Sequence, residues 1–194
     1  MPLTCFKAYD IRGRLGVDLD EEIAYRIGRA FAQALNAKSV VLGRDVRASS
    51  EALANSVAQG LMDQGCEVLD LGLSGTEEMY FATTHFGVDA GICITASHNP
   101  MDYNGMKMVR SGSAPLDAAS GLERIKALAE ENAFSKSAHP GKIRNVASEA
   151  RAAYVERVCQ FIDVSALKPL KILVNAGHGT AGPTFDAIAE KLSE

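Results

Sequence analysis

Ser97 is the residue of this chain best suited to covalent chemistry, because it lies in a short polar segment (TASHNP) that follows an apolar run. Residues 91–95 (GICIT) are typical of a strand that is buried on both faces. Pro100 fixes its own φ and prevents a helix from starting early, while Asn104 and Gly105 favour a turn. The pattern predicts a serine hydroxyl held out between two strands. Such a hydroxyl can take up a group and give it back.

His98 and Lys107 are the nearest candidates for a chemical role beside Ser97. Adjacent residues cannot form a nucleophile and base pair of the triad kind, and no G-x-S-x-G pattern surrounds the serine, so hydrolase chemistry is disfavoured. His98 can act in proton transfer or simply orient the loop. Lys107 is predicted on the returning strand, where it faces the same cleft and stabilises charge, or transfers a proton if its pKa is lowered. The alternative for Lys107 is an ordinary exposed lysine.

The elements that must position these residues alternate between strand and helix patterns. Strands are expected at residues 3–9, 39–42, 66–71, 91–95 and up to Val109, and helices at residues 21–36, from Ser49 or Ser50 to Gly65, from a cap at Thr76 to about Gly87, and at 117–130. This order predicts an α/β fold, a layered α/β/α domain with a mostly parallel mixed sheet.

Polar side chains follow the predicted strands where each one ends. They are Tyr9, Asp10 and Arg12 after the first strand, Arg44 and Asp45 after the second, Ser74 and Thr76 after the third, and Ser97 after the fourth. Because active sites of such sheets lie beyond the carboxyl ends of the strands, one shared cleft is expected. In this cleft Arg44 and Asp45 are predicted to brace the serine loop, and Asn99 and Asn104 to hold it through side-chain to backbone bonds.

The C-terminal part of the sequence is predicted to be the start of a second domain. A polar surface connection (131–145) leads to a helix at residues 147–162, a strand at 170–174 and a last helix from about Pro183. One strand and two helices cannot bury a core of their own. We therefore divide the chain into a first domain, 1–146, and the truncated opening of a second, 147–194.

Composition excludes several classes of protein. The chain has 194 residues, 47% of them hydrophobic, and a net charge of −4, which argues against nucleic acid as a partner. No apolar run approaches the roughly 20 residues that span a bilayer, and the N-terminus lacks a signal-peptide core, so a cytoplasmic protein with no membrane partner is expected. The four cysteines have no metal spacing and are predicted to be free thiols, most of them buried.

Four segments together resemble the α-D-phosphohexomutase superfamily, most closely the bacterial phosphomannomutase/phosphoglucomutase type. They are FKAYDIRG, VLGRDVRASS, GLSGTEEMYFAT and TASHNP followed by DYNGMK, in the order and spacing of that family's first domain. Any one of them alone is a weak signal, whereas four spread over about a hundred residues are a strong one. The resemblance implies a phosphohexomutase first domain followed by the opening of a similar second domain.

The resemblance also implies a reaction and its residues. Ser97 carries a phosphoryl group that passes between hexose 6-phosphate and hexose 1-phosphate through a hexose 1,6-bisphosphate, with mannose phosphates as the favoured substrates and glucose or glucosamine phosphates left open. Tyr9, Arg12 and Lys107 contact the substrate, and Arg12 also reaches the phosphoserine, unless it merely pairs with Asp10 or Asp18. Mg²⁺ is implied, with the phosphate on Ser97 as the only ligand from this chain. The family's metal, sugar and phosphate loops, on domains II–IV, have no counterpart here, so the chain reads as a fragment with little or no turnover alone.

Two other functions stay open at this point. The same cationic cleft suits a non-catalytic module that only binds a sugar phosphate. Residues 177–182 (GHGTAG) also fit the G-x-G-x-x-G dinucleotide fingerprint, after a predicted strand and before a helix. The acidic residue that completes this fingerprint lies beyond the last residue of the sequence.

Overall fold

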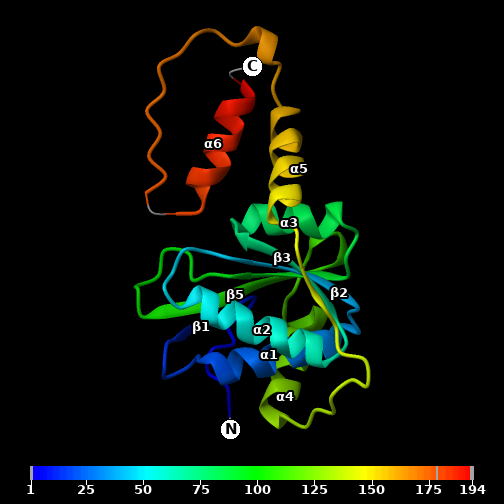
Figure 1. The fold of residues 1–194 in the computed structure, drawn as a ribbon. Coiled ribbons are helices and arrows are strands. Elements are labelled where there is room, and N and C mark those ends of the chain that lie inside the picture. The colour runs from blue at the N-terminus through cyan, green and yellow to red at the C-terminus, as the bar shows by residue number, and fades with distance from the viewer. Residues whose placement is uncertain (1, 178, 193–194) are drawn as a thin grey trace.

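The computed structural model describes residues 2–177 and 179–192, which form one mixed sheet with helices on both faces (Figure 1). The strands are β1 (Ile11–Arg14), β2 (Ser39–Arg44), β3 (Glu67–Leu73), β4 (Ala90–Ile94), β5 (Tyr103–Arg110), β6 (Ala114–Pro115) and β7 (Ile143–Asn145). The helices are α1 (Glu21–Leu35), α2 (Ser50–Asp63), α3 (Thr76–His85), α4 (Glu123–Glu131), α5 (Ala147–Cys159) and α6 (Ala181–Leu192). Short 3₁₀ or π turns lie at Ser111–Ser113, Ala118–Leu122 and Val164–Ala166.

The sheet runs in the order β1-β5-β4-β2-β3-β7, and β6 pairs with β5. Parallel ladders join β4, β2, β3 and β7, whereas β5 is antiparallel to β1, β4 and β6. One reversed strand thus stands in a sheet whose other strands share one direction. The predicted layered α/β/α fold with a mostly parallel mixed sheet is confirmed.

Alternation along the inner strands builds two separate apolar cores, because successive side chains of a strand point to opposite faces. The first core joins Val40, Leu42, Ile92 and Ile94 to α1, α2 and α4; the second joins Val41, Leu69, Leu71 and Cys93 to α3 and the start of α5. Figure 1 shows α1 and α2 covering one face of the sheet and α3 the other. The strand that leads to Ser97 is buried along its whole length, as its apolar run predicts.

Helix α1 shows how local sequence sets the elements that carry the site. The Asp20 side chain accepts a hydrogen bond from the Ile23 N–H at 2.7 Å, and two acidic residues occupy the first turn. Asn36 ends the helix in a left-handed conformation, with its N–H bonded to carbonyls of the last turn. On the buried face Ile27 and Phe31 pack into the first core. The predicted helix is confirmed to within one residue.

Two predicted boundaries near the site are wrong. The first strand is not residues 3–9 but Ile11–Arg14, because the backbone that pairs with β5 begins after the turn at Lys7–Asp10. Arg12 therefore lies within a strand and not after one. The N-cap of α3 is Gly75 and not Thr76; the Gly75 N–H donates to Glu78 Oε2 at 2.7 Å.

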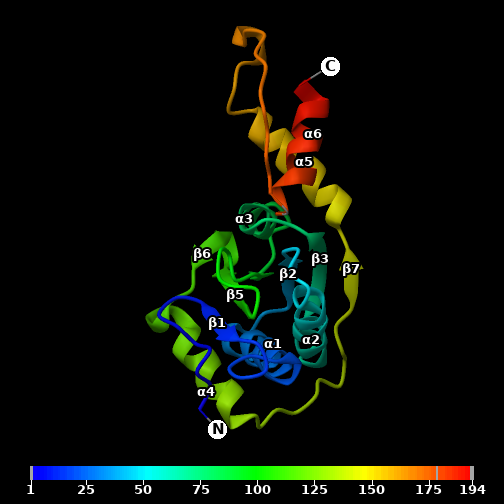
Figure 2. The ribbon, with the colours of Figure 1, turned by 90° about the vertical axis from the view of Figure 1, so that its left-hand side faces the viewer.

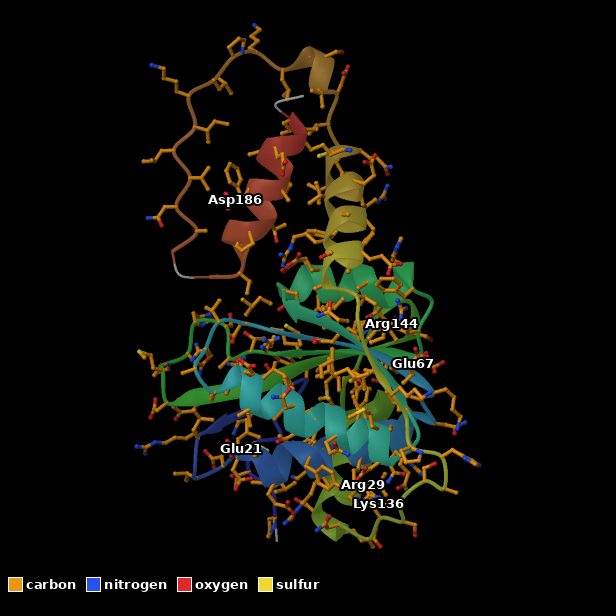
Figure 3. The ribbon with its side chains drawn as sticks, viewed as in Figure 1. Glu21, Arg29, Glu67, Lys136, Arg144 and Asp186 are labelled. Carbon is orange, nitrogen blue, oxygen red and sulfur yellow. The ribbon has the colours of Figure 1, made fainter. Side chains whose placement is uncertain are left out.

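The C-terminal segment differs from its prediction in two places. The connection contains the strand β7, which extends the sheet beside β3, and Figure 3 shows Glu67 and Arg144 at this edge. Residues 170–174 form no strand; they are extended and exposed, because no neighbouring strand pairs with them in the described part of the chain. Figure 2 shows α5 and α6 side by side beyond the sheet, with the extended segment looping between them.

The proposed division between residues 146 and 147 coincides with the start of α5. Val146 and Ala150 nevertheless belong to the second core, packed against β3 and α3. The ion pair between Arg151 and Glu78, at 3.3 Å, fixes α5 to α3. The two-domain division stays a prediction, and the first turns of α5 pack with the first domain.

The cysteines are free thiols, and Cys5, Cys66 and Cys93 are buried. Burial raises the pKa of the Cys66 thiol from 9.0 to about 12 and that of Cys93 likewise to about 12, since the thiolate would lose its hydration. Burial also raises the pKa of Cys5 to about 11. Because the thiolate is the reactive form, these three thiols are protected from modification.

The free energy of unfolding is therefore expected to fall as the pH becomes alkaline. The three thiols ionise near pH 9 in the unfolded chain but stay protonated when folded, so their contribution is fully present below pH 9 and is lost as pH rises toward 11 to 12. Urea unfolding between pH 8 and 10 measures this fall, and Cys93→Ala should make it shallower. An identical pH slope in Cys93→Ala would contradict the expectation.

Candidate active site

A cleft of about 950 Å³ lies beyond the carboxyl ends of β2, β3 and β4. The segments that follow these three strands contribute residues 45–48, 75–77 and Thr95, Ser97 and His98 to its lining. Lys107 enters from the reversed strand β5, and Tyr80 from α3. The structure thus brings Ser97, His98, Lys107 and Asp45 together at one edge of the sheet.

Ser97 lies in a strained turn just after the C-terminal end of β4. Its φ is 55°, in the left-handed region that costs a residue with a side chain roughly 1–2 kcal/mol. The turn is stabilised by the Ser97 N–H, which donates to Thr95 Oγ1 at 2.9 Å. The surrounding structure therefore imposes a conformation that presents the hydroxyl to the cleft, as strain at functional sites commonly does.

His98 contacts the hydroxyl that precedes it. The distance from His98 Nδ1 to Ser97 Oγ is 3.3 Å, and which atom donates depends on the tautomer of the imidazole. This geometry suits both roles expected of His98, since a ring nitrogen at that distance can orient the hydroxyl or exchange a proton with it.

Lys107 lies directly across the β4 and β5 ladder from Cys93. Its side chain lines the main cleft and also a neighbouring cavity of about 330 Å³, to which Tyr9 and Asp10 contribute. In the part of the chain that the structure describes, no hydrogen bond or ion pair engages Lys107 Nζ. The ammonium group is therefore available to a ligand that spans the two hollows.

Tyr9 and Arg12 are placed differently from each other. Tyr9 is 65% exposed beside the smaller cavity. The Arg12 guanidinium pairs with Asp10, at 2.8 Å, whose side chain is only 6% exposed. This is the salt bridge that was the alternative for Arg12, and Arg12 lines neither hollow. Arg12 can bind a ligand in the cleft only through the guanidinium N–H groups that do not pair with Asp10.

The residues predicted to support the loop differ in whether and how they contact it. Asn104 is buried and its amide nitrogen donates to Ser49 Oγ at 2.8 Å and to Ser50 Oγ at 2.9 Å. Asn99 contributes through its backbone, whose N–H donates to the Ala96 carbonyl. Arg44 pairs with Glu51, with 3.8 Å between charged atoms, and no hydrogen bond joins its side chain to the loop among the described residues.

Arg47 is the residue that the sequence reasoning missed. Its guanidinium donates four hydrogen bonds to backbone carbonyls of the serine loop, at 2.6–3.0 Å, and Asp45 faces its Nε at 3.5 Å. The available signal was its place in GRDVR, two residues beyond Asp45 at a strand end. Sequence alone did not distinguish it from Arg44, which ends the strand itself.

The residues present do not by themselves fit a Mg²⁺ ion. That ion takes an octahedral set of oxygen ligands, usually with carboxylates among them. Across residues 2–177 and 179–192, no three His, Cys, Asp or Glu side chains come together as a metal site.

Over the same residues, no helix combines the length and apolar character needed to cross a bilayer.

The glycine-rich turn before α6 lacks the context of a dinucleotide site. Gly177 has a φ of 59° and α6 begins at Ala181, but the residues leading into the turn form no strand. His178 lies outside the described residues. Gly179 and Thr180 instead contribute to the lining of the main cleft.

Comparisons with known proteins agree with this geometry. The family described as phosphoglucomutase/phosphomannomutase, alpha/beta/alpha domain I, matches residues 4–136. Curated phosphomannomutases from Salmonella typhimurium and Klebsiella pneumoniae are 55% and 62% identical over 192 and 132 residues, covering 98% and 68% of this chain and 42% and 84% of those proteins.

A crystal structure of a phosphoglucomutase/phosphomannomutase family protein from Burkholderia thailandensis superposes with a TM-score of 0.85 at 34% identity, over all of this chain and 43% of that one. The chain thus spans about 42% of the length of the Salmonella relative. The matched segment contains the whole sheet except β7, together with the serine loop. The chain belongs to the phosphoglucomutase/phosphomannomutase family.

Proposed function

We propose that this chain is the phosphoserine domain of a phosphohexomutase that interconverts hexose 6-phosphate and hexose 1-phosphate. The observation that carries the proposal is the Ser97 hydroxyl on a strained turn, facing a cleft that also receives Lys107, whose ammonium group has no partner among the described residues. The names of the relatives favour mannose phosphates as substrates. Glucose and glucosamine phosphates are the alternative substrates.

In the proposed reaction the bond between phosphorus and Ser97 Oγ breaks while a bond forms to a free hydroxyl of the bound hexose monophosphate. The proton of that hydroxyl passes to a base in the cleft, Ser97 Oγ takes up a proton as it leaves phosphorus, and the product is a hexose 1,6-bisphosphate. The other phosphate then returns to Ser97 Oγ, whose proton passes to a base, while the sugar oxygen that this phosphate leaves takes up a proton. The net reaction moves a phosphate between two positions and leaves the serine phosphorylated.

Individual side chains support this step in distinct ways. Lys107 neutralises charge on the oxygens of the phosphoryl group, which is the main demand of phosphoryl transfer. His98 orients the Ser97 hydroxyl or exchanges its proton. Tyr9 and Arg12 contact the sugar phosphate from the β1 side. Asp45 and Asn104 stabilise the conformation of the serine loop.

The rest of the active enzyme lies outside this chain in the proposal. Domains II–IV supply the contacts that this chain lacks, and the chain alone has little or no turnover. Mg²⁺ would be held by the phosphate on Ser97 together with ligands from those domains, and it would supply positive charge to the phosphoryl group when bound. Hexose 1,6-bisphosphate is both the intermediate and the activator that loads the serine.

The test is an intact mass with peptide mapping, before and after incubation with a hexose 1,6-bisphosphate and Mg²⁺. One phosphoryl group on Ser97 is expected. Ser165 is the internal control, since it is an exposed serine whose hydroxyl donates to Asp163 and which lines neither hollow. Phosphate on both serines indicates nonspecific transfer. Binding of the sugar phosphate without any phosphoserine, in the full natural protein, supports the non-catalytic module instead.

A further inference from the structure

We propose that Arg47 is the positioning residue of the phosphoryl-transfer step, because it holds the serine loop in the one conformation that presents Ser97. This inference rests on the proposed function and adds to it a residue that does not touch the substrate. Arg47 lies at the end of β2, about fifty positions before the loop in the sequence. Its side chain is only 15% exposed although it lines the cleft.

The contacts of Arg47 span the whole loop. Nη2 donates to the carbonyl of Ser97 at 2.9 Å and to that of Asn99 at 2.6 Å. Nη1 donates to the carbonyls of Pro100, at 2.8 Å, and Tyr103, at 3.0 Å. Four carbonyls on the two arms of the loop therefore converge on one planar cation. Bonds to a charged donor are roughly twice as strong as neutral ones.

A count of donors separates this role from phosphate binding. A guanidinium has five N–H groups, one on Nε and two on each Nη. The four Nη donors are taken by the loop carbonyls, and Nε faces Asp45 Oδ2 at 3.5 Å. Only the Nε N–H remains, and it faces a carboxylate rather than a substrate phosphate. Arg47 therefore acts on the substrate through the loop that it holds.

Asp45 anchors the backbone of Arg47 as well as facing its guanidinium. Asp45 Oδ1 accepts hydrogen bonds from the backbone N–H of Arg47, at 3.1 Å, and from the Ser50 hydroxyl. Ser50 Oγ in turn accepts from Asn104, at the start of β5, where the loop ends. Ser50, the first residue of α2, therefore links Asp45 to the end of the loop at Asn104.

Such a brace is needed because Ser97 would not hold its conformation unaided. At a φ of 55° a serine is disfavoured relative to the extended and right-handed regions. Without the bonds to Arg47 the loop can relax, which moves the hydroxyl and any phosphate on it. A displacement of about 1 Å from the productive geometry can cost on the order of 100-fold in rate.

The experiment compares Arg47→Ala and Arg47→Lys in the full natural protein, with kcat and KM measured for the sugar phosphate. We expect kcat of Arg47→Ala to fall about 100-fold while KM changes less than about threefold. Lysine keeps the charge, but a single ammonium cannot span four carbonyls, so Arg47→Lys should lose about tenfold in kcat. Arg26→Ala is the control, since Arg26 is similarly covered but pairs with Glu22 on α1.

Hydrogen exchange on the same variants gives a second, activity-independent measurement. Amides of residues 97–103 should exchange faster in Arg47→Ala and, if that variant does not fold, in Arg47→Lys. Unchanged kcat together with unchanged exchange overturns the inference and leaves the proposed function intact. A raised KM at unchanged kcat overturns it in favour of direct substrate binding. A wild-type protein with no phosphoryl transfer overturns the proposed function itself, and the positioning role with it.

Discussion

Replacing Ser97 with alanine is expected to remove the interconversion of hexose phosphates in the full natural protein, with kcat at least about 10⁴-fold lower, since loss of a nucleophile costs on the order of 10⁶ in well-studied enzymes. The physical reason is that alanine has no oxygen to form or break the bond to phosphorus. The fold should be unaffected, because alanine and serine meet the same strain at a φ of 55°. Coupled assays of the sugar phosphate measure the rate, and calorimetry measures binding.

Calorimetry on Ser97→Ala also tests whether the cleft binds the sugar phosphate without the serine hydroxyl. Ser97→Ala should still bind a hexose monophosphate with nearly wild-type affinity, because the lysine and the backbone of the cleft remain. Ser165→Ala is a suitable control, since Ser165 is an exposed turn serine bonded to Asp163 far from the cleft. Wild-type turnover in Ser97→Ala would sink the phosphoserine mechanism and favour a group elsewhere as the phosphoryl carrier.

Replacing Gly105 with alanine is expected to cause the largest loss of stability among single substitutions near the site. A Cβ at this position would lie 2.0 Å from the Ile11 carbonyl oxygen and 3.2 Å from Arg12 Cα, both of them backbone atoms of the neighbouring strand β1. Backbone cannot move aside as a flexible side chain can. We expect a loss of about 3 kcal/mol in the free energy of unfolding, at the upper end for overpacking. This corresponds to a fall of about 10 °C in Tm.

The matched control for Gly105 is Gly112→Ala. Gly112 has a positive φ of 65°, but no heavy atom lies within 4 Å of its hypothetical Cβ. Its cost should come from backbone conformation alone and amount to about 1 kcal/mol. Chemical denaturation of both variants measures the difference. If the two cost the same, the close approach of β1 and β5 is not as tight as described.

Local signals account for most of the elements that sequence analysis placed correctly. Asp20 as an N-cap and the spacing of Ile27 and Phe31 define α1 without any knowledge of the sheet. The apolar run before Ser97 likewise indicates a strand buried on both faces, which β4 is. In such segments the burial pattern and the capping residues lie within one element, so the sequence carries the information directly.

The misplaced strands and the missed arginine share a different cause, since each depends on a partner that is remote in the sequence. Residues 3–9 have the local character of a strand, but the strand forms at residues 11–14, where the backbone pairs with β5. Residues 170–174 have strand character but no neighbour to pair with among the described residues. Arg47 meets its loop across about fifty positions, and no local pattern shows which arginine of GRDVR turns toward it.

The extended segment after α5 has a practical consequence for handling the chain. Leu173 is 97% exposed, and Leu170 and Ile172 are also largely exposed, on backbone that pairs with no other strand within residues 2–177 and 179–192. Such a stretch is a template for pairing with another copy, and such pairing drives aggregation. Phosphoryl-loading and melting experiments on this chain therefore belong at low protein concentration. At low concentration the monomer is the species that is measured, and strand pairing between aggregated copies does not add to its apparent free energy of unfolding.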